Sequence, residues 1–202
     1  QALIEAVAVR YASPQPADRA PLDQAFAAAM AEAYRRFPDD GDIGALYAEA
    51  LLDLHPWDLW THAGEPKEWT PEVVAVLEEV LGRHPAHPLA LHLYIHAVEA
   101  SSEPGRADRA ANALRDLTPG LGHLVHMPSH IDVRRGRWEE AIAANTKAIE
   151  ADRAYRKAAP APPDFYRLYM SHNHHMKAYA AMMIGRSEVA LTSIRELVAD
   201  IP

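Results

Sequence analysis

Cysteine is absent from this chain of 202 residues. Its absence excludes disulfide bonds, zinc sites built from thiolates, and cysteine nucleophiles. Basic residues are also in the minority, because 20 Lys and Arg stand against 28 Asp and Glu and the formal net charge is −8. Nucleic-acid binding needs a basic surface, so the composition argues against a nucleic-acid partner.

Long apolar runs are missing as well. No stretch approaches the roughly 18 consecutive apolar residues of a membrane helix, and the first residues lack the basic-then-apolar pattern of a signal peptide. We therefore expect no membrane anchor, and a soluble, cytoplasmic location is favoured. The compartment stays open, because the chain begins at Gln1 and a removed signal peptide is compatible with that start.

Histidine is what the chain has in excess. Eight of its twelve histidines fall in three short windows, 92–96, 123–130 and 172–175, far more than its mean histidine density predicts. Metal ligation, proton transfer or a polar binding groove would explain such clustering.

The apolar pattern predicts an all-α protein. Apolar residues recur at helical spacing nearly everywhere, as at Leu22, Phe26, Met30 and Ala33, and no stretch alternates like a strand. The helical runs end at prolines or at two matching turns of the form GR-x-E, at 136–139 and 185–188.

These punctuation marks define a repeat. Units begin near Gly41, Pro88, Gly122 and Ser171, after a helix pair over about 1–39. The step from Pro88 to Gly122 is about 34 residues, the length of a tetratricopeptide repeat (TPR). The small residues that this repeat needs where its helices cross are Ala107, Ala141 and Ala190. The sequence thus predicts a TPR-like helical-repeat solenoid of about five antiparallel helix pairs, forming one superhelical domain over 1–202.

Two insertions interrupt the period, at about 55–71 and 153–170. The first carries Trp57, Trp60 and Trp69, and the second carries Phe165, Tyr166 and Tyr169. Extra residues in a solenoid map to loops on one face, often the binding face. The alternative is that these aromatic side chains cap the ends of the helix stack.

The repeat places seven histidines at equivalent positions of three first helices. Position five holds His92, His126 and His175, position nine holds His96 and His130, and position two holds His123 and His172. These positions share one helix face, and first helices line the concave side of a TPR-like array. We therefore expect a ladder of histidines along a groove.

Spacing within the helices points to a metal site. His92 and His96 are four residues apart, as are His126 and His130, and Glu99 follows His96 by three. Side chains at these spacings share a face and can converge on one ion, and imidazole suits a transition metal such as Zn, Cu or Fe. We predict these four histidines as the main ligands, with Glu99 as a ligand or general base. The other histidines available to join them are His123, His172 and His175. The alternative is that histidines on a concave face hydrogen-bond to peptide or water.

Pro128 lies between the two histidines of the second pair. It either kinks a continuous helix or lies in the first turn of a new one. In both cases His123 and His126 lie on less regular backbone than His130.

Four motifs carry a family resemblance: LLDLHPWDLWT at 51–61, HLYIHAVEAS at 92–101, GHLVHMPSHI at 122–131 and HNHH at 172–175. Together they resemble a family of bacterial TPR-domain proteins that shares the patterns HxxxHAVE, GHLVHMPSHI and HNxH. The resemblance implies that the seven histidines and Glu99 belong to the family pattern and that His174 does not. It also implies that the chain is the C-terminal part of a longer protein, and it implies no particular reaction.

Three functions are compatible with these patterns. The first is a transition-metal-binding domain, which as an enzyme would be a His-ligated, metal-dependent one acting on a small molecule or peptide. The second is an interaction scaffold that binds a peptide in the groove. The third is a metal-free pocket in which histidine acts as acid and base. The oligomeric state stays open in all three. The aromatic residues expected to wall the pocket are Trp57, Trp60, Tyr94, Tyr166, Tyr169 and Tyr179.

Overall fold

A computed structural model describes residues 1–159 and 164–200. Every regular element in these residues is a helix, apart from an isolated β-bridge between Trp60 and Pro66. The chain divides into two compact units, Gln1–Ser102 and Glu103–Pro202, and each is described by itself. The single domain expected over 1–202 stays a prediction.

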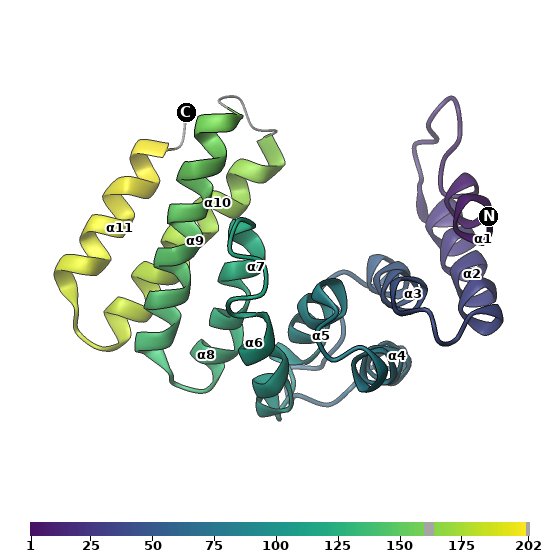
Figure 1. The fold of residues 1–202 in the computed structure, drawn as a ribbon, viewed down its shortest axis with the longest axis horizontal. Helices are drawn as coiled ribbons and strands as arrows, with labels where there is room; N and C mark the ends of the chain where they lie inside the picture. The colour runs from purple at the N-terminus through teal and green to yellow at the C-terminus, as the bar shows by residue number, and fades with distance from the viewer. Residues whose placement is uncertain (160–163, 201–202) are drawn as a thin grey trace. The chain divides into compact units, whose positions relative to one another are not determined.

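The first unit contains helices α1 to α5 (Figure 1). Each helix packs against the next one in the chain, and α3 also packs against α5. Side chains cap two of the helices. The Asp40 carboxylate accepts a hydrogen bond from the Ile43 N–H (3.1 Å), and the His87 Nδ1 accepts one from the Ala90 N–H (3.2 Å). The helix bounds are Ala2–Ala8 (α1), Ala20–Arg36 (α2), Gly41–Leu54 (α3), Thr70–Arg83 (α4) and Pro88–Glu99 (α5).

The first insertion forms the loop between α3 and α4, and two of its tryptophans hold it in place. The Trp60 indole N–H donates to the Ala97 carbonyl of α5 (2.7 Å), and the Trp69 indole donates to the Asp58 carbonyl (2.8 Å). His55 stacks on Trp69 with ring centroids 3.8 Å apart. Trp57 differs from them, because 93% of it is exposed.

The second unit contains a short 3-10 helix, η1, followed by helices α6 to α11. Helix α8 packs against α6 and α9, whereas α10 packs against α7, α9 and α11 (Figure 1). The buried alanines Ala141, Ala180 and Ala190 lie in one apolar cluster where α9, α10 and α11 meet. The bounds are Pro104–Ala107 (η1), Asp108–Leu114 (α6), Gly122–His126 (α7), Pro128–Arg134 (α8), Trp138–Ala158 (α9), Asp164–Met183 (α10) and Ser187–Asp200 (α11).

The two GR-x-E segments are matching helix ends. Gly136 and Gly185 both have φ of +71°, a left-handed conformation that glycine adopts without strain. The N–H of the following arginine then reaches back to the helix, from Arg137 to the Asp132 carbonyl (2.7 Å) and from Arg186 to the Ala181 carbonyl (2.9 Å). This is the Schellman pattern of helix termination, and it repeats as the sequence predicts.

The second insertion lengthens helices instead of forming a loop, so the loop expectation is wrong for its described residues. Helix α9 continues to Ala158, where the Ala159 N–H still donates to the Tyr155 carbonyl (2.8 Å), and α10 begins at Asp164. The helical hydrogen-bond pattern therefore extends into both flanks of the insertion. Residues 160–163 lie outside the described residues.

Pro128 begins a helix and does not kink one. Helix α7 ends at His126, and Pro128 is the first residue of α8. A backbone N–H at the first position of a helix has no partner within that helix. Proline, which lacks an N–H, therefore removes no helical hydrogen bond at this position. Met127 between them keeps helical φ and ψ angles, so the two short helices follow almost without a turn.

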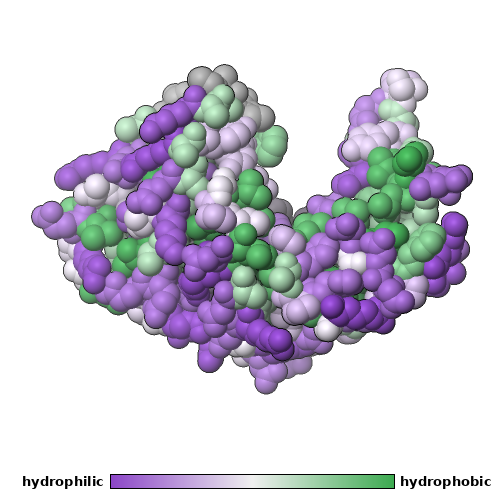
Figure 2. Space-filling model, viewed as in Figure 1, coloured by the Kyte–Doolittle hydropathy of each residue, from purple (hydrophilic) through white to green (hydrophobic). Residues whose placement is uncertain are grey.

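Figure 2 shows mostly hydrophilic side chains over the second unit, with smaller hydrophobic areas between them. Across residues 1–159 and 164–200, no helix combines the length and the apolar character needed to cross a membrane.

Candidate metal centre

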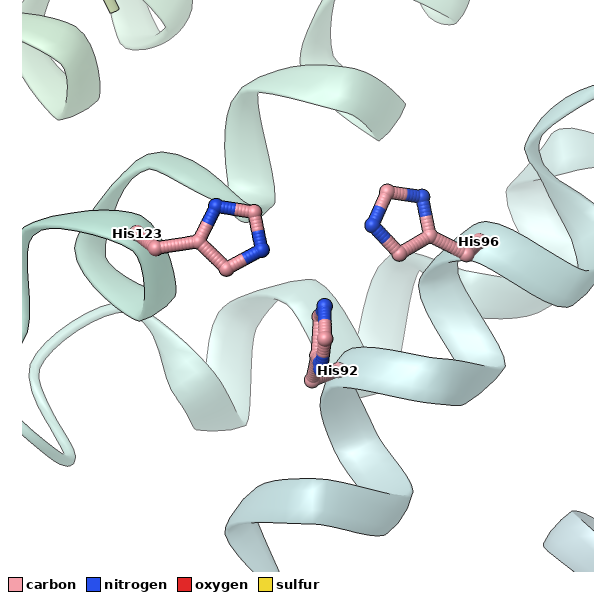
Figure 3. Close-up of side chains that lie close together, drawn as sticks. All are labelled: His92, His96 and His123. Carbon is pink, nitrogen blue, oxygen red and sulfur yellow. The ribbon is translucent and has the colours of Figure 1, made fainter. Parts of the chain in front are cut away.

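In the first unit, α5 carries His92, His96 and Glu99 along one face. The two imidazole rings lie edge to face with centroids 5.0 Å apart, and Figure 3 shows both on the same side of the helix. The His96 Nδ1 lies 2.9 Å from a Glu99 carboxylate oxygen. A carboxylate in this position fixes the ring orientation of a histidine and raises its basicity.

In the second unit, three histidines from three helices converge. His126 ends α7, His130 lies on α8 and His172 lies on α10. One ring nitrogen of each lies within 4.8 Å of the other two. The ring centroids of His126 are 4.8 Å from those of both His130 and His172. His126 and His130 meet because they are one helical turn apart, and His172 joins because α10 packs against α7.

Asn145 sets the proton position on His126. The Asn145 amide N–H donates to the Ala141 carbonyl (2.8 Å), which leaves its oxygen facing His126 Nδ1 at 2.7 Å. Nδ1 must therefore carry the proton and donate it, because an amide oxygen only accepts. The neutral ring then holds its lone pair on Nε2.

Burial keeps that ring neutral. His126 is fully buried, and desolvation lowers its pKa well below the usual value. The neighbouring His130 lowers this pKa further, whereas the hydrogen bond to Asn145 opposes the shift. A neutral imidazole is the form that binds metals.

The Nε2 lone pair of His126 points at His130. The two Nε2 atoms are 2.8 Å apart, so the His130 N–H donates to His126 when no ion is bound. Two nitrogens on one tetrahedral zinc ion lie about 3.3 Å apart, given Zn–N distances near 2.0–2.1 Å. A shift of roughly half an ångström converts this pair into metal ligands. His130 and His172 are only half-buried, so their side chains have room for it.

Two further histidines of this unit lie beside the cluster. His123 of α7 lies beside His126, with centroids 6.0 Å apart, and contacts the Tyr169 ring at 4.4 Å. Figure 3 shows the His123 side chain on its helix. His175 is exposed on α10, and its centroid is 6.1 Å from that of His172.

The aromatic residues predicted to wall the pocket lie in different parts of the two units. Tyr94 is buried and its hydroxyl donates to Glu78 of α4 (2.6 Å), so it joins α5 to α4. The Tyr166 hydroxyl is 3.4 Å from an Asp152 carboxylate oxygen. Tyr179 is 40% exposed and lies edge-on to Trp138. Tyr169 is in ring contact with His123 of the second unit.

Reasoning from the sequence did not identify Asn145 and Asp152 as part of the centre. Both are buried polar residues of α9, a second helix of the repeat, whereas the histidine ladder directs attention to first helices. Asp152 accepts a hydrogen bond from the Asn173 amide (2.7 Å), next to His172 in the chain. An asparagine on the apolar face of α9 is the sequence signal that could have revealed Asn145.

The chain matches no protein-family model and no curated protein. It is similar to solved structures of MamA, of which two are described. One is residues 41 to the end of MamA from Desulfovibrio magneticus RS-1, at a TM-score of 0.64, and the other is the MamA RS-1 ArsTM double mutant, at 0.65. Both are 14% identical to this chain, and each match covers 90% of this chain and 86% of the other. The similarity confirms the all-α, TPR-like repeat fold, while the motif-bearing family stays a prediction.

Proposed function

We propose that the second unit binds a transition metal ion through His126, His130 and His172. The observation that supports this most directly is the Nε2 lone pair of a neutral, buried His126, which Asn145 aims at two further imidazoles. Each imidazole suits Zn, Cu, Ni or Fe, and the cysteine-free chain offers nitrogen and oxygen ligands only.

Three histidine ligands are the number found in open zinc sites, where a fourth position takes water or substrate. A bound ion supplies Lewis acidity to whatever occupies that position. The protein's contribution is to hold the rings: Asn145 orients His126, and the packing of α10 on α7 holds His172. The roles expected for His92, His96, Glu99, His123 and His175 stay predictions.

The test compares two histidines of α10. Metal-stripped protein is titrated with Zn²⁺ by calorimetry and with Co²⁺ by absorption spectroscopy. His172→Ala should weaken binding by more than about tenfold. Removing a residue that only hydrogen-bonds to a metal ligand already costs that much, and His172 is proposed as a ligand itself. His175→Ala is the matched control, because it removes an exposed imidazole from the same helix. The proposal fails if the chain binds no ion stoichiometrically, or if the two variants bind equally.

Peptide binding is a second candidate function. Helical repeats present extended surfaces that bind peptides, and the confirmed TPR-like fold favours this use. It predicts binding of a protein partner in the presence of a metal chelator, which the first proposal does not.

A further inference from the structure

A second candidate site lies in the first unit. A cavity of about 210 Å³ opens between the C-terminal half of α3, the loop that follows it, and α5. Its walls are mainly apolar, with Leu52, Leu59 and Leu93 among them. Sites for drug-sized ligands are about 300–1,000 Å³, so this cavity takes a smaller group, such as one side chain or a short alkyl chain.

One polar end of the cavity is acidic. Glu49 and Asp53 lie one turn apart on α3 and both line the cavity. Asp53 is paired with Arg10 at 2.5 Å. Glu49 is half-buried, and no residue within 1–159 or 164–200 hydrogen-bonds to its carboxylate or pairs with it. Desolvation raises the pKa of Glu49, with Asp53 adding to the shift and Arg10 opposing it. A carboxylate in this position gains from a cation that replaces the water it has lost.

Trp57 stands at the rim of the same cavity in a strained conformation. Its φ of +55° is left-handed, which costs a bulky residue about 1–2 kcal/mol. The anchors described above hold the loop on the C-terminal side of Trp57, through Trp60 and Trp69, while the indole of Trp57 itself stays 93% exposed. An indole face kept in water, on a cavity that a carboxylate also lines, is a suitable partner for a cation.

We infer that this cavity binds an aliphatic chain that ends in an ammonium group. The leucines contact the alkyl part, the Glu49 carboxylate pairs with the ammonium, and Trp57 covers it at the rim. A lysine side chain of a partner peptide and a free alkylamine share this chemistry. The inference does not rest on the metal centre, because the residues that it uses lie in the first unit.

The test uses the full chain with chelator present, so that no metal contributes. The probes are n-butylamine and a capped alanine pentapeptide with a central lysine, measured by NMR chemical-shift titration. A single side-chain ligand of this size should bind with a dissociation constant of about 1 mM. The uncharged probes n-butanol and the norleucine pentapeptide should bind at least about tenfold more weakly.

Two variants locate the binding. Glu49→Gln keeps the shape and removes the charge, and it should weaken both amine probes about tenfold. Trp57→Gly removes the indole and relieves the left-handed backbone, so it should weaken binding about threefold while stabilising the fold. Glu68→Gln is the charge-matched control, an exposed acid in the same loop.

The titrations distinguish the two possible sources of the ammonium group. Binding of the peptide alone identifies a partner's lysine, binding of the amine alone identifies a small molecule, and binding of both supports the shared chemistry. The inference is overturned if butanol binds as well as butylamine, if Glu49→Gln binds like the unmodified chain, or if neither amine probe shifts a resonance of the cavity.

Discussion

Asn145 is the residue that turns a group of histidines into an ordered site. Its amide is fixed by Ala141 on its own helix, so its oxygen meets His126 Nδ1 and holds the ring in one tautomer and orientation. His126, in turn, presents its Nε2 lone pair to His130, and its ring lies edge-on to that of His172. In the proposed metal site, a side chain that does not contact the ion would thus determine whether the three imidazoles are aligned.

Asn145→Ala should therefore weaken metal binding about 10–100-fold. The reason is that His126 can then adopt the other tautomer, which protonates Nε2. The Zn²⁺ titration described above measures the change, and circular dichroism checks that the helices persist. Thr146→Ala is a suitable control, since Thr146 bonds only to the Ile142 carbonyl of its own helix. Unchanged affinity in Asn145→Ala would remove Asn145 from the site.

Asp152 should give the second unit a pH-dependent stability. Burial raises its pKa to about 6, although hydrogen bonds from Asn173 and Tyr166 oppose this. The folded state therefore holds the proton more tightly than the unfolded chain. The resulting stabilisation is full below the unfolded pKa, near 4, and is lost as the pH rises through about 6.

Urea unfolding in chelator compares the unmodified chain with Asp152→Asn, which cannot titrate. Between pH 4.5 and pH 7 the unmodified chain should lose roughly 1–2 kcal/mol relative to the variant, after allowance for solvent screening. Asp116→Asn serves as control, because Asp116 forms only an exposed ion pair with Lys147. A difference between chain and variant that stays constant with pH would contradict the shifted pKa.

The histidines themselves could be predicted from the sequence, and their partners could not. His126, His130 and His172 occupy repeat positions, and a repeat fixes which positions face the next helix. Asn145, Asp152 and Glu49 occupy no shared repeat position, so their contacts depend on how particular helices pack. Trp57 illustrates the same limit, because nothing in the sequence indicates its left-handed backbone.

At the scale of helices, a buried carboxylate locks α6 to α8. Asp132 has no exposed side-chain surface, and it accepts two hydrogen bonds from Arg115 (2.9 and 3.1 Å) and one from Arg137 (2.9 Å). If the carboxylate is lost, Arg115 is 23% exposed to water, and Arg137 still pairs with Asp108 (2.9 Å). Loss of the acid and loss of the arginines should therefore differ in their effect on stability.

Removing both arginines should cost more than removing the acid. The double variant Arg115→Ala, Arg137→Ala leaves a buried charge unpaired and should lose about 3–5 kcal/mol of unfolding free energy. Asp132→Asn keeps the volume and leaves Arg115 partly exposed and Arg137 paired with Asp108, so about 1–3 kcal/mol is expected. Chemical denaturation measures both. If Asp132→Asn lost more unfolding free energy than the double variant, the arginines, and not Asp132, would carry the desolvation cost.

The helices also show which features a sequence pattern determines: their ends can be predicted, and their lengths cannot. The GR-x-E turns could be predicted because glycine and its neighbours specify a helix end locally. The break in the repeat length predicts a loop for the second insertion, yet α9 and α10 extend into it. A repeat period counts residues between helices, and it does not say whether added residues remain helical.

For the whole molecule, the TPR-like fold was predictable from periodicity and is confirmed by the structural similarity to MamA. The division into two units was not predictable, because the repeat spacing continues across Ser102. Because of this division, the metal proposal can be tested by comparing the local stability of the two units. Binding in the second unit should leave the first unit's local stability unchanged.

Hydrogen exchange with and without Zn²⁺ measures this. Amide exchange should slow in α7, α8 and α10, by about tenfold or more where local opening breaks a ligand contact, because an ion that binds only the folded state adds its binding free energy. Helices α1 and α2 serve as the internal reference. Equal protection of all helices would mean that the ion acts through general stabilisation and not through the three histidines.

The three-helix origin of the histidine cluster has a consequence for a chain without cysteine. His126 and His172 are far apart in sequence, with the whole of α9 between them. An ion held by both would join two distant parts of the chain and stabilise the fold by its binding free energy, because it leaves when the ligands separate on unfolding. Such a metal cross-link depends on ion supply and pH and not on thiol redox state.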